Sequence, residues 1–203
     1  MSQTNHSEIK LYIDLMQEVK NRIEIVNNII NGSKSTGSLE TNIEFCCLQI
    51  RKILELISLG SLTMNKIEFE RQSIKYQHFW NSKKILADIE KINPNFYPKP
   101  LIMLPIKDKN GSVPIIDMQS GFLSKEDFVE VYNSVNEILH ADSPFREKTD
   151  FKEYSSKLAG WVNKIVKLIN LHRIRLYKNT DFYLVYVYNA EGENVQAVHY
   201  PNP

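Results

Sequence analysis

IEFCCLQIRKILELISLGSL, residues 43–62, is the stretch that decides the fold. Its apolar residues occupy most sides of a helix rather than a single stripe, and the charged residues among them are few. A helix that is apolar on most of its sides is stable where other helices surround it. We therefore expect a helix that begins after Ser38 and ends near Leu62 to form the buried centre of a helical bundle.

Five further stretches have helical patterns. Residues 9–30 carry apolar side chains at intervals of three and four, which is typical of a helix with one buried face. Ser124, with Asp127 three residues later, is a good N-cap for another helix. The predicted surrounding helices cover residues 9–30, 65–76, 82–92, 124–140 and 151–171.

Two segments have the pattern of β-ribbons. NPNFYPKP, residues 93–100, stops the helices with three prolines, and the two apolar runs that follow flank Asn110-Gly111, a strong hairpin signal. Pro105 and Pro114 confine this ribbon to an edge. Near the C-terminus, an aromatic and β-branched run, a glycine turn and a second run predict a hairpin.

These elements predict a mainly α (α+β) fold in one domain. The helical bundle of about five or six helices covers residues 8–92 and 124–171, the ribbon insert residues 94–123, and the C-terminal hairpin residues 174–200. A chain of 203 residues is long enough to bury a real core.

Composition limits the function classes. The 25 Lys and Arg nearly balance the 24 Asp and Glu, so the charge requires neither nucleic acid nor membrane as a partner. The start of the chain lacks the pattern of a signal peptide, no apolar run is long enough to cross a membrane, and Cys46 and Cys47 are adjacent. We expect a cytoplasmic protein with reduced thiols.

Motifs for common cofactors are missing. The sequence has no P-loop, GxGxxG turn, GxSxG elbow or HExxH zinc motif. No histidine or further cysteine stands at ligand spacing from Cys46 and Cys47. We expect neither a cofactor nor a metal.

Arg71 and His78 lie seven positions apart, so on a helix they share a face. This Arg-x6-His pair, the chain length and the helical content resemble the HEPN class of small RNA-cutting domains. The resemblance implies metal-independent cleavage of RNA at a dimer cleft, with Arg71 stabilising charge and His78 moving protons. The class usually has Asn, Asp or His where Gln72 stands, and Phe79 and Trp80 suggest core packing, so the alternative is a helix face with a partly packed histidine.

A second group of polar residues lies on and near the central helix. Glu44, Arg51 and Glu55 fall on one line of that helix. They form either a solvated strip with an Arg51–Glu55 ion pair or a polar cleft in which Arg51 binds an anion. His140, at a predicted helix C-terminus, either caps that helix or joins the cleft.

One basic concentration stands out near the C-terminus. It contains Lys164, Lys167, His172, Arg173, Arg175 and Lys178. We interpret Lys164, Lys167, Arg173 and Arg175 as candidates for a phosphate-facing surface, although cations near a helix C-terminus are favourable in any protein. The aromatic residues of the tail favour cross-strand packing over base stacking, since no cations alternate with them.

Taken together, the sequence predicts an interaction or regulatory module that self-associates, as a homodimer, through helix faces or the edge of a ribbon. The sequence does not identify a protein partner. The alternative is a HEPN-like ribonuclease of toxin or phage-defence type, for which RNA would be the substrate.

Overall fold

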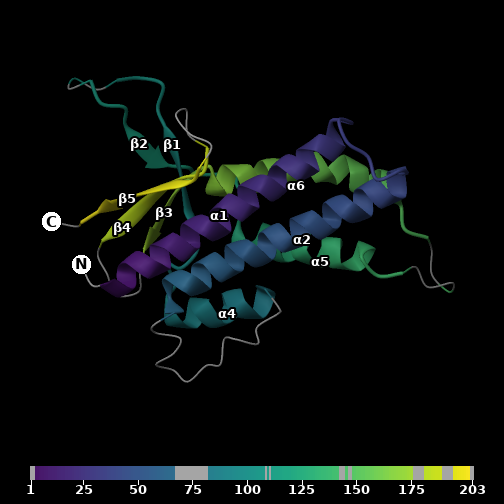
Figure 1. The fold of residues 1–203 in the computed structure, drawn as a ribbon, viewed down its shortest axis with the longest axis horizontal. Helices are drawn as coiled ribbons and strands as arrows, with labels where there is room; N and C mark the ends of the chain where they lie inside the picture. Colours follow the sequence, from purple (N-terminus) through teal and green to yellow (C-terminus); the bar gives the residue numbers. More distant parts are fainter. Residues whose placement is uncertain are drawn as a thin grey trace.

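The computed structural model of the protein describes residues 3–66, 82–107, 109, 111–141, 145, 148–175, 181–188 and 194–201. Within these ranges the chain forms five helices and five strands (Figure 1). The helices are α1 (Gln3–Ile30), α2 (Leu39–Met64), α4 (Ser82–Ile92), α5 (Lys125–Ile138) and α6 (Phe151–Ile169). The strands are β1 (Lys99–Met103), β2 (Ile115–Asp117), β3 (Leu171–Arg175), β4 (Phe182–Tyr186) and β5 (Gln196–Tyr200).

The predicted fold class is confirmed: the protein is a mainly helical α+β fold with a strand group at its C-terminal end. The helix that was expected over residues 65–76 falls mostly on residues 67–81, which lie outside the described residues. Of the other predicted helices, each has a counterpart, and the last one ends at Ile169 instead of continuing to Leu171.

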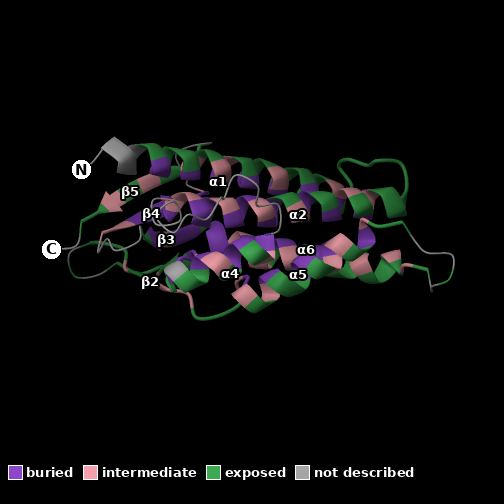
Figure 2. Ribbon diagram, turned by 90° about the horizontal axis from the view of Figure 1, so that it is seen from below, coloured by how far each residue is buried: buried purple, intermediate pink, exposed green. Residues whose placement is uncertain are grey.

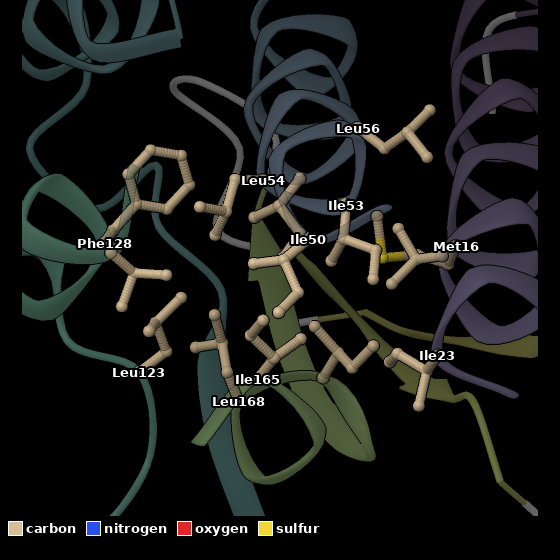
Figure 3. Packing of buried hydrophobic residues seen from close by; sticks show 14 of the residues in the cluster. Met16, Ile23, Ile50, Ile53, Leu54, Leu56, Leu123, Phe128, Ile165 and Leu168 are labelled. Carbon is tan, nitrogen blue, oxygen red and sulfur yellow. The ribbon is translucent and has the colours of Figure 1, made fainter. Parts of the chain in front are cut away.

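Helix α2 is the centre of the bundle, as its apolar sequence predicts. It contacts α1, α4, α5 and α6. Its Ile50, Ile53 and Leu54 are fully buried, and Figure 3 shows them between Met16 of α1 on one side and Phe128 of α5 on the other. In Figure 2 the buried residues accordingly gather on the facing sides of the helices.

Capping residues fix where two of these helices begin. Ser38 accepts a hydrogen bond from the Thr41 backbone N–H and precedes α2. Ser124 likewise accepts from the Asp127 N–H, and the Asp127 carboxylate accepts from the Ser124 N–H in return. The predicted N-cap at Ser124 is therefore confirmed, with Asp127 in the role that Glu or Gln has in the usual capping box.

The five strands form one antiparallel sheet in the order β2-β1-β3-β4-β5. The predicted ribbon is the pair β1–β2, and the predicted C-terminal hairpin is the pair β4–β5. β3 was not predicted, and it joins the two ribbons by pairing with β1 on one side and β4 on the other. In Figure 1 the sheet lies at the end of the bundle where both termini are found. Its β1–β2 ribbon projects away from the helices.

The two faces of the sheet have different surroundings. On the inner face, Ile174, Tyr183 and Val185 belong to the main core. On the outer face, Leu101, Leu171 and Leu184 form a second, smaller apolar cluster with Phe182 and Tyr186. Because side chains alternate along a strand, Arg173 and Arg175 share the outer face with Leu171.

None of the described helices combines the length and the apolar character that a membrane crossing needs.

Candidate functional site

Arg71 and His78, the pair that resembles the HEPN motif, lie within residues 67–81, outside the described residues. The catalytic and the structural interpretation of this pair both stay predictions.

The polar residues of α2 form an ion pair at the surface of the bundle. The Arg51 Nε donates to Glu55 Oε1 at 3.0 Å, and the two side chains are 40% and 29% exposed. This hydrogen bond raises the pKa of the Arg51 guanidinium above its usual value. Glu44 is exposed. Such a half-exposed pair contributes little to stability, because solvent screens it.

His140 is exposed just beyond the end of α5. Its backbone N–H donates to the carbonyl oxygen of Glu137 at 3.2 Å, which closes the last turn of the helix.

The four predicted phosphate-facing residues separate into two places. On α6, Lys164 donates to the Asp127 carboxylate of α5 at 2.7 Å, and Lys167 is exposed with its ammonium group next to Gly121. Arg173 and Arg175 lie on the outer face of the sheet, on β3.

His172, grouped with these basic residues in the sequence, does not share their surface. It is fully buried on the inner face of the sheet, because strand alternation turns it away from Arg173. Its place among the basic residues of the sequence therefore does not put it on their surface.

His172 instead forms a buried hydrogen-bonded pair with Tyr12 of α1. The Tyr12 Oη lies 2.8 Å from His172 Nε2, and His172 Nδ1 lies 2.8 Å from the carbonyl oxygen of Ile169. A carbonyl oxygen only accepts, so Nδ1 carries the proton and donates. Nε2 is then the acceptor, and the Tyr12 hydroxyl donates to it.

Burial sets the charge of both groups. It lowers the pKa of His172 to about 4 and raises the pKa of the Tyr12 hydroxyl far above its usual value. At neutral pH both side chains are therefore uncharged. Because Tyr12 is 1% exposed and His172 0%, no substrate reaches either group, and we interpret the pair as a polar connection between α1 and the sheet.

This pair is hard to recognise in the sequence. Tyr12 occupies one position in the apolar stripe of α1, and His172 stands among cations. Only recognition of β3 would have separated His172 from its neighbours, through the alternation of side chains along a strand.

The β1–β2 ribbon carries a concentration of exposed apolar residues, which we call the ribbon surface. Within it, Ile102 pairs with Ile116 and Met103 with Ile115 across the two strands. Their exposed fractions range from 36% for Ile115 to 62% for Ile106 near the tip. The ribbon surface consists of Ile102, Met103, Ile106, Val113, Ile115 and Ile116.

β2 is also an edge of the sheet. Among the described strands it pairs with β1 alone, so the backbone groups on its other side have no strand partner there. An edge strand of this kind is a template for pairing with another strand.

No family model, curated protein or solved structure matches the chain. A function for this chain is therefore proposed from the physical features of its described residues.

The described residues contain no group of three or more His, Cys, Asp or Glu side chains placed to hold a metal ion.

Proposed function

We propose that the protein is an interaction module that self-associates by joining the β1–β2 ribbons of two copies. The observation that carries this proposal is the ribbon surface, where six large apolar side chains are exposed on the two faces of a ribbon at the sheet edge. Apolar side chains that are exposed singly are ordinary, whereas several on one short ribbon at a sheet edge indicate an interaction site.

A second copy of the chain fits this edge for a geometric reason. Two identical edge strands related by a two-fold axis run antiparallel, so each can donate and accept backbone hydrogen bonds with the other. The apolar side chains next to β2 are then buried from both copies at once. A short strand limits the number of backbone bonds, so most of the affinity would come from these side chains.

Charge also favours a second copy. The only carboxylate on β2, Asp117, is held within its own chain by Lys99 at 2.7 Å and Arg173 at 3.3 Å. Two copies can therefore approach without bringing unpaired carboxylates together.

Measuring mass by sedimentation equilibrium over a range of concentrations tests this proposal. We expect the wild-type protein to form a dimer that dissociates on dilution, and Ile116→Lys to be a monomer, because a lysine there would be buried without a partner. Ile25→Lys on α1 is the matched control, since Ile25 is 41% exposed and Ile116 43%. This control is expected to keep the wild-type mass.

A wild-type protein that stays monomeric at about 100 μM, or an Ile116→Lys protein that still dimerises, would contradict the proposal. Dimerisation lost in Ile25→Lys and kept in Ile116→Lys would place the interface on a helix face instead. The ribonuclease alternative rests on the resemblance to the HEPN class, through Arg71 and His78, the chain length and the helical content.

A further inference from the structure

Three cations share one place on the outer face of the sheet. Lys99 of β1 and Arg173 of β3 are direct cross-strand partners, and Arg175 stands two positions after Arg173 on the same face. Like charges that lie directly opposite each other destabilise a sheet. Anions near these three cations would therefore reduce their mutual repulsion.

One carboxylate, that of Asp117, neutralises part of this positive charge. Asp117 contacts Lys99 at 2.7 Å and Arg173 at 3.3 Å. The hydrogen bond from Lys99 and the charge of Arg173 lower the pKa of the Asp117 carboxyl, so it is ionised at neutral pH.

Arg175 is exposed, and within the described part of the chain no carboxylate pairs with it. Three cations and one anion leave two positive charges.

The same cations line a cavity of about 370 Å³. Its other walls are the rings of Tyr97 and Phe122, together with Asn95 and three prolines of the 94–100 segment. A cavity of this size is at the small end of the range for small-molecule sites. The cavity thus combines a cationic side with a wall of rings and prolines.

Several contacts hold these walls in place before any ligand binds. The Tyr97 hydroxyl donates to the carbonyl oxygen of Leu123 at 3.0 Å. The Arg173 guanidinium lies 5.6 Å from the centre of the Phe182 ring, which stacks on Tyr200. Side chains that are already held lose less conformational freedom on binding.

We propose that this cavity binds a phosphate monoester of a small molecule, with the phosphate between Arg173 and Arg175 and the organic part against Tyr97 and Phe122. A phosphate monoester carries roughly −1.5 to −2 charges at neutral pH, which matches the two unpaired positive charges. Guanidinium groups bind phosphate oxygens with two parallel hydrogen bonds. A carboxylate would leave one of the charges uncompensated.

The site does not depend on the proposed dimer, since all of its residues come from one chain. It also differs from a nucleic-acid surface. The chain has a net charge of +1, and the three cations line one cavity instead of forming a long track for a strand.

Isothermal titration calorimetry at low salt tests this inference, with 5′-AMP as the probe of a phosphate monoester. We expect 5′-AMP to bind, inorganic phosphate to compete with it, and adenosine not to bind. Arg175→Ala is expected to weaken 5′-AMP binding by about tenfold or more, because it removes an exposed guanidinium without disturbing the core. Lys52→Ala removes an exposed cation from α2 and is expected to leave the affinity unchanged.

Four results would overturn the proposal. The first is no binding of 5′-AMP at about 1 mM. The second is binding of adenosine as tight as that of 5′-AMP. The third is unchanged affinity in Arg175→Ala. The fourth is affinity for single-stranded RNA that exceeds that for 5′-AMP and increases with the length of the strand, which would assign the cations to a nucleic-acid surface. Sedimentation of the same samples keeps this test separate from that of the dimer.

Discussion

Losing the hydrogen bond from the Tyr12 hydroxyl to the neutral His172 would reduce the stability of the fold, because both side chains are fully buried. Tyr12 and His172 satisfy each other, and the Ile169 carbonyl satisfies the second ring nitrogen. A buried acceptor that loses its donor costs about 1–3 kcal/mol, more than the net value of the hydrogen bond itself. The pair therefore specifies how α1 meets the sheet as well as stabilising the contact.

Tyr12→Phe tests this cost directly. The change removes one hydroxyl and leaves His172 Nε2 buried without a donor, so we expect the free energy of unfolding to fall by about 1–3 kcal/mol. Urea denaturation followed by circular dichroism measures the change. Tyr200→Phe is the control, since Tyr200 is 40% exposed and its side chain is accessible to water. Equal stability of the two variants would mean that the buried hydroxyl contributes nothing.

The pKa of His172 predicts a dependence of stability on pH. Burial lowers this pKa from 6.5 to about 4, so the unfolded chain binds a proton at a pH where the folded chain does not. The contribution of His172 is fully present above pH 6.5, and it is lost as the pH falls toward 4, by roughly 3 kcal/mol in total.

Comparing the wild type with His172→Gln isolates this effect, because the other titrating groups are common to both proteins. We expect the difference in free energy of unfolding between the two to shrink from pH 7 to pH 4.5. A difference that stays constant over this range would show that His172 titrates normally.

The two thiols offer a third prediction about single residues. Cys46 and Cys47 are fully buried in α2, and burial raises the pKa of their thiols to about 11 and about 12. Since the thiolate is the reactive form, we expect neither to react with a thiol reagent such as DTNB until the protein unfolds. Rapid labelling of the native protein at both positions would contradict the buried position of α2.

At the scale of elements, the close contact of α1 and α2 depends on a residue without a side chain. A Cβ placed on Gly60 of α2 would lie 3.0 Å from Cε2 of Tyr12 and 3.3 Å from Cε of Met16. The Tyr12 ring cannot easily move away, because its hydroxyl is bound to His172. Gly60 thus leaves room beside α2 for the Tyr12 ring, whose hydroxyl binds His172.

Replacing two helical glycines by alanine separates helix propensity from packing. A Cβ placed on Gly160 of α6 would meet no atom within 4 Å, so Gly160→Ala should stabilise the protein by about 0.5–1 kcal/mol. Gly60→Ala gains the same propensity but must displace Tyr12, and we expect it to destabilise the protein. Thermal melts of the two variants measure both signs. A stabilised Gly60→Ala protein would show that Tyr12 can shift without cost.

Prediction from sequence succeeded for some elements and failed for β3, for physical reasons. α2 is apolar on most of its sides, which leaves few alternatives to a central helix. β3 has the sequence LHRIR, in which an inward-facing histidine and an outward-facing leucine disturb the usual alternation of apolar and polar residues. Because β3 was not predicted, the hydrogen bond between Tyr12 and His172 was not predicted either.

At the scale of the whole molecule, only part of the cationic cavity could be predicted from the sequence. Arg173 and Arg175 stand in the basic concentration, but Lys99 lies between two prolines far earlier in the chain. It reaches them because β1 pairs with β3. Pairing between distant strands depends on how the bundle places the ribbon, and no local pattern encodes that placement.

The resemblance to HEPN domains leads to a prediction about the whole assembly, because an arginine and a histidine that are predicted to share one helix would supply only half of a cleft. Incubating the purified protein with a mixed single-stranded RNA, without divalent metal, tests it. We expect no cleavage, since the overall charge is close to zero, Gln72 departs from the usual motif, and the adjacent Phe79 and Trp80 favour core packing.

Cleavage that disappears in both Arg71→Ala and His78→Ala, while circular dichroism shows an intact fold, would contradict this expectation and make the protein a nuclease. Ile116→Lys then serves as a third variant. If the ribbon dimer brings two copies of the pair together, this monomeric protein should lose activity although Arg71 and His78 are unchanged. Activity that persists in all three variants would come from a contaminating nuclease.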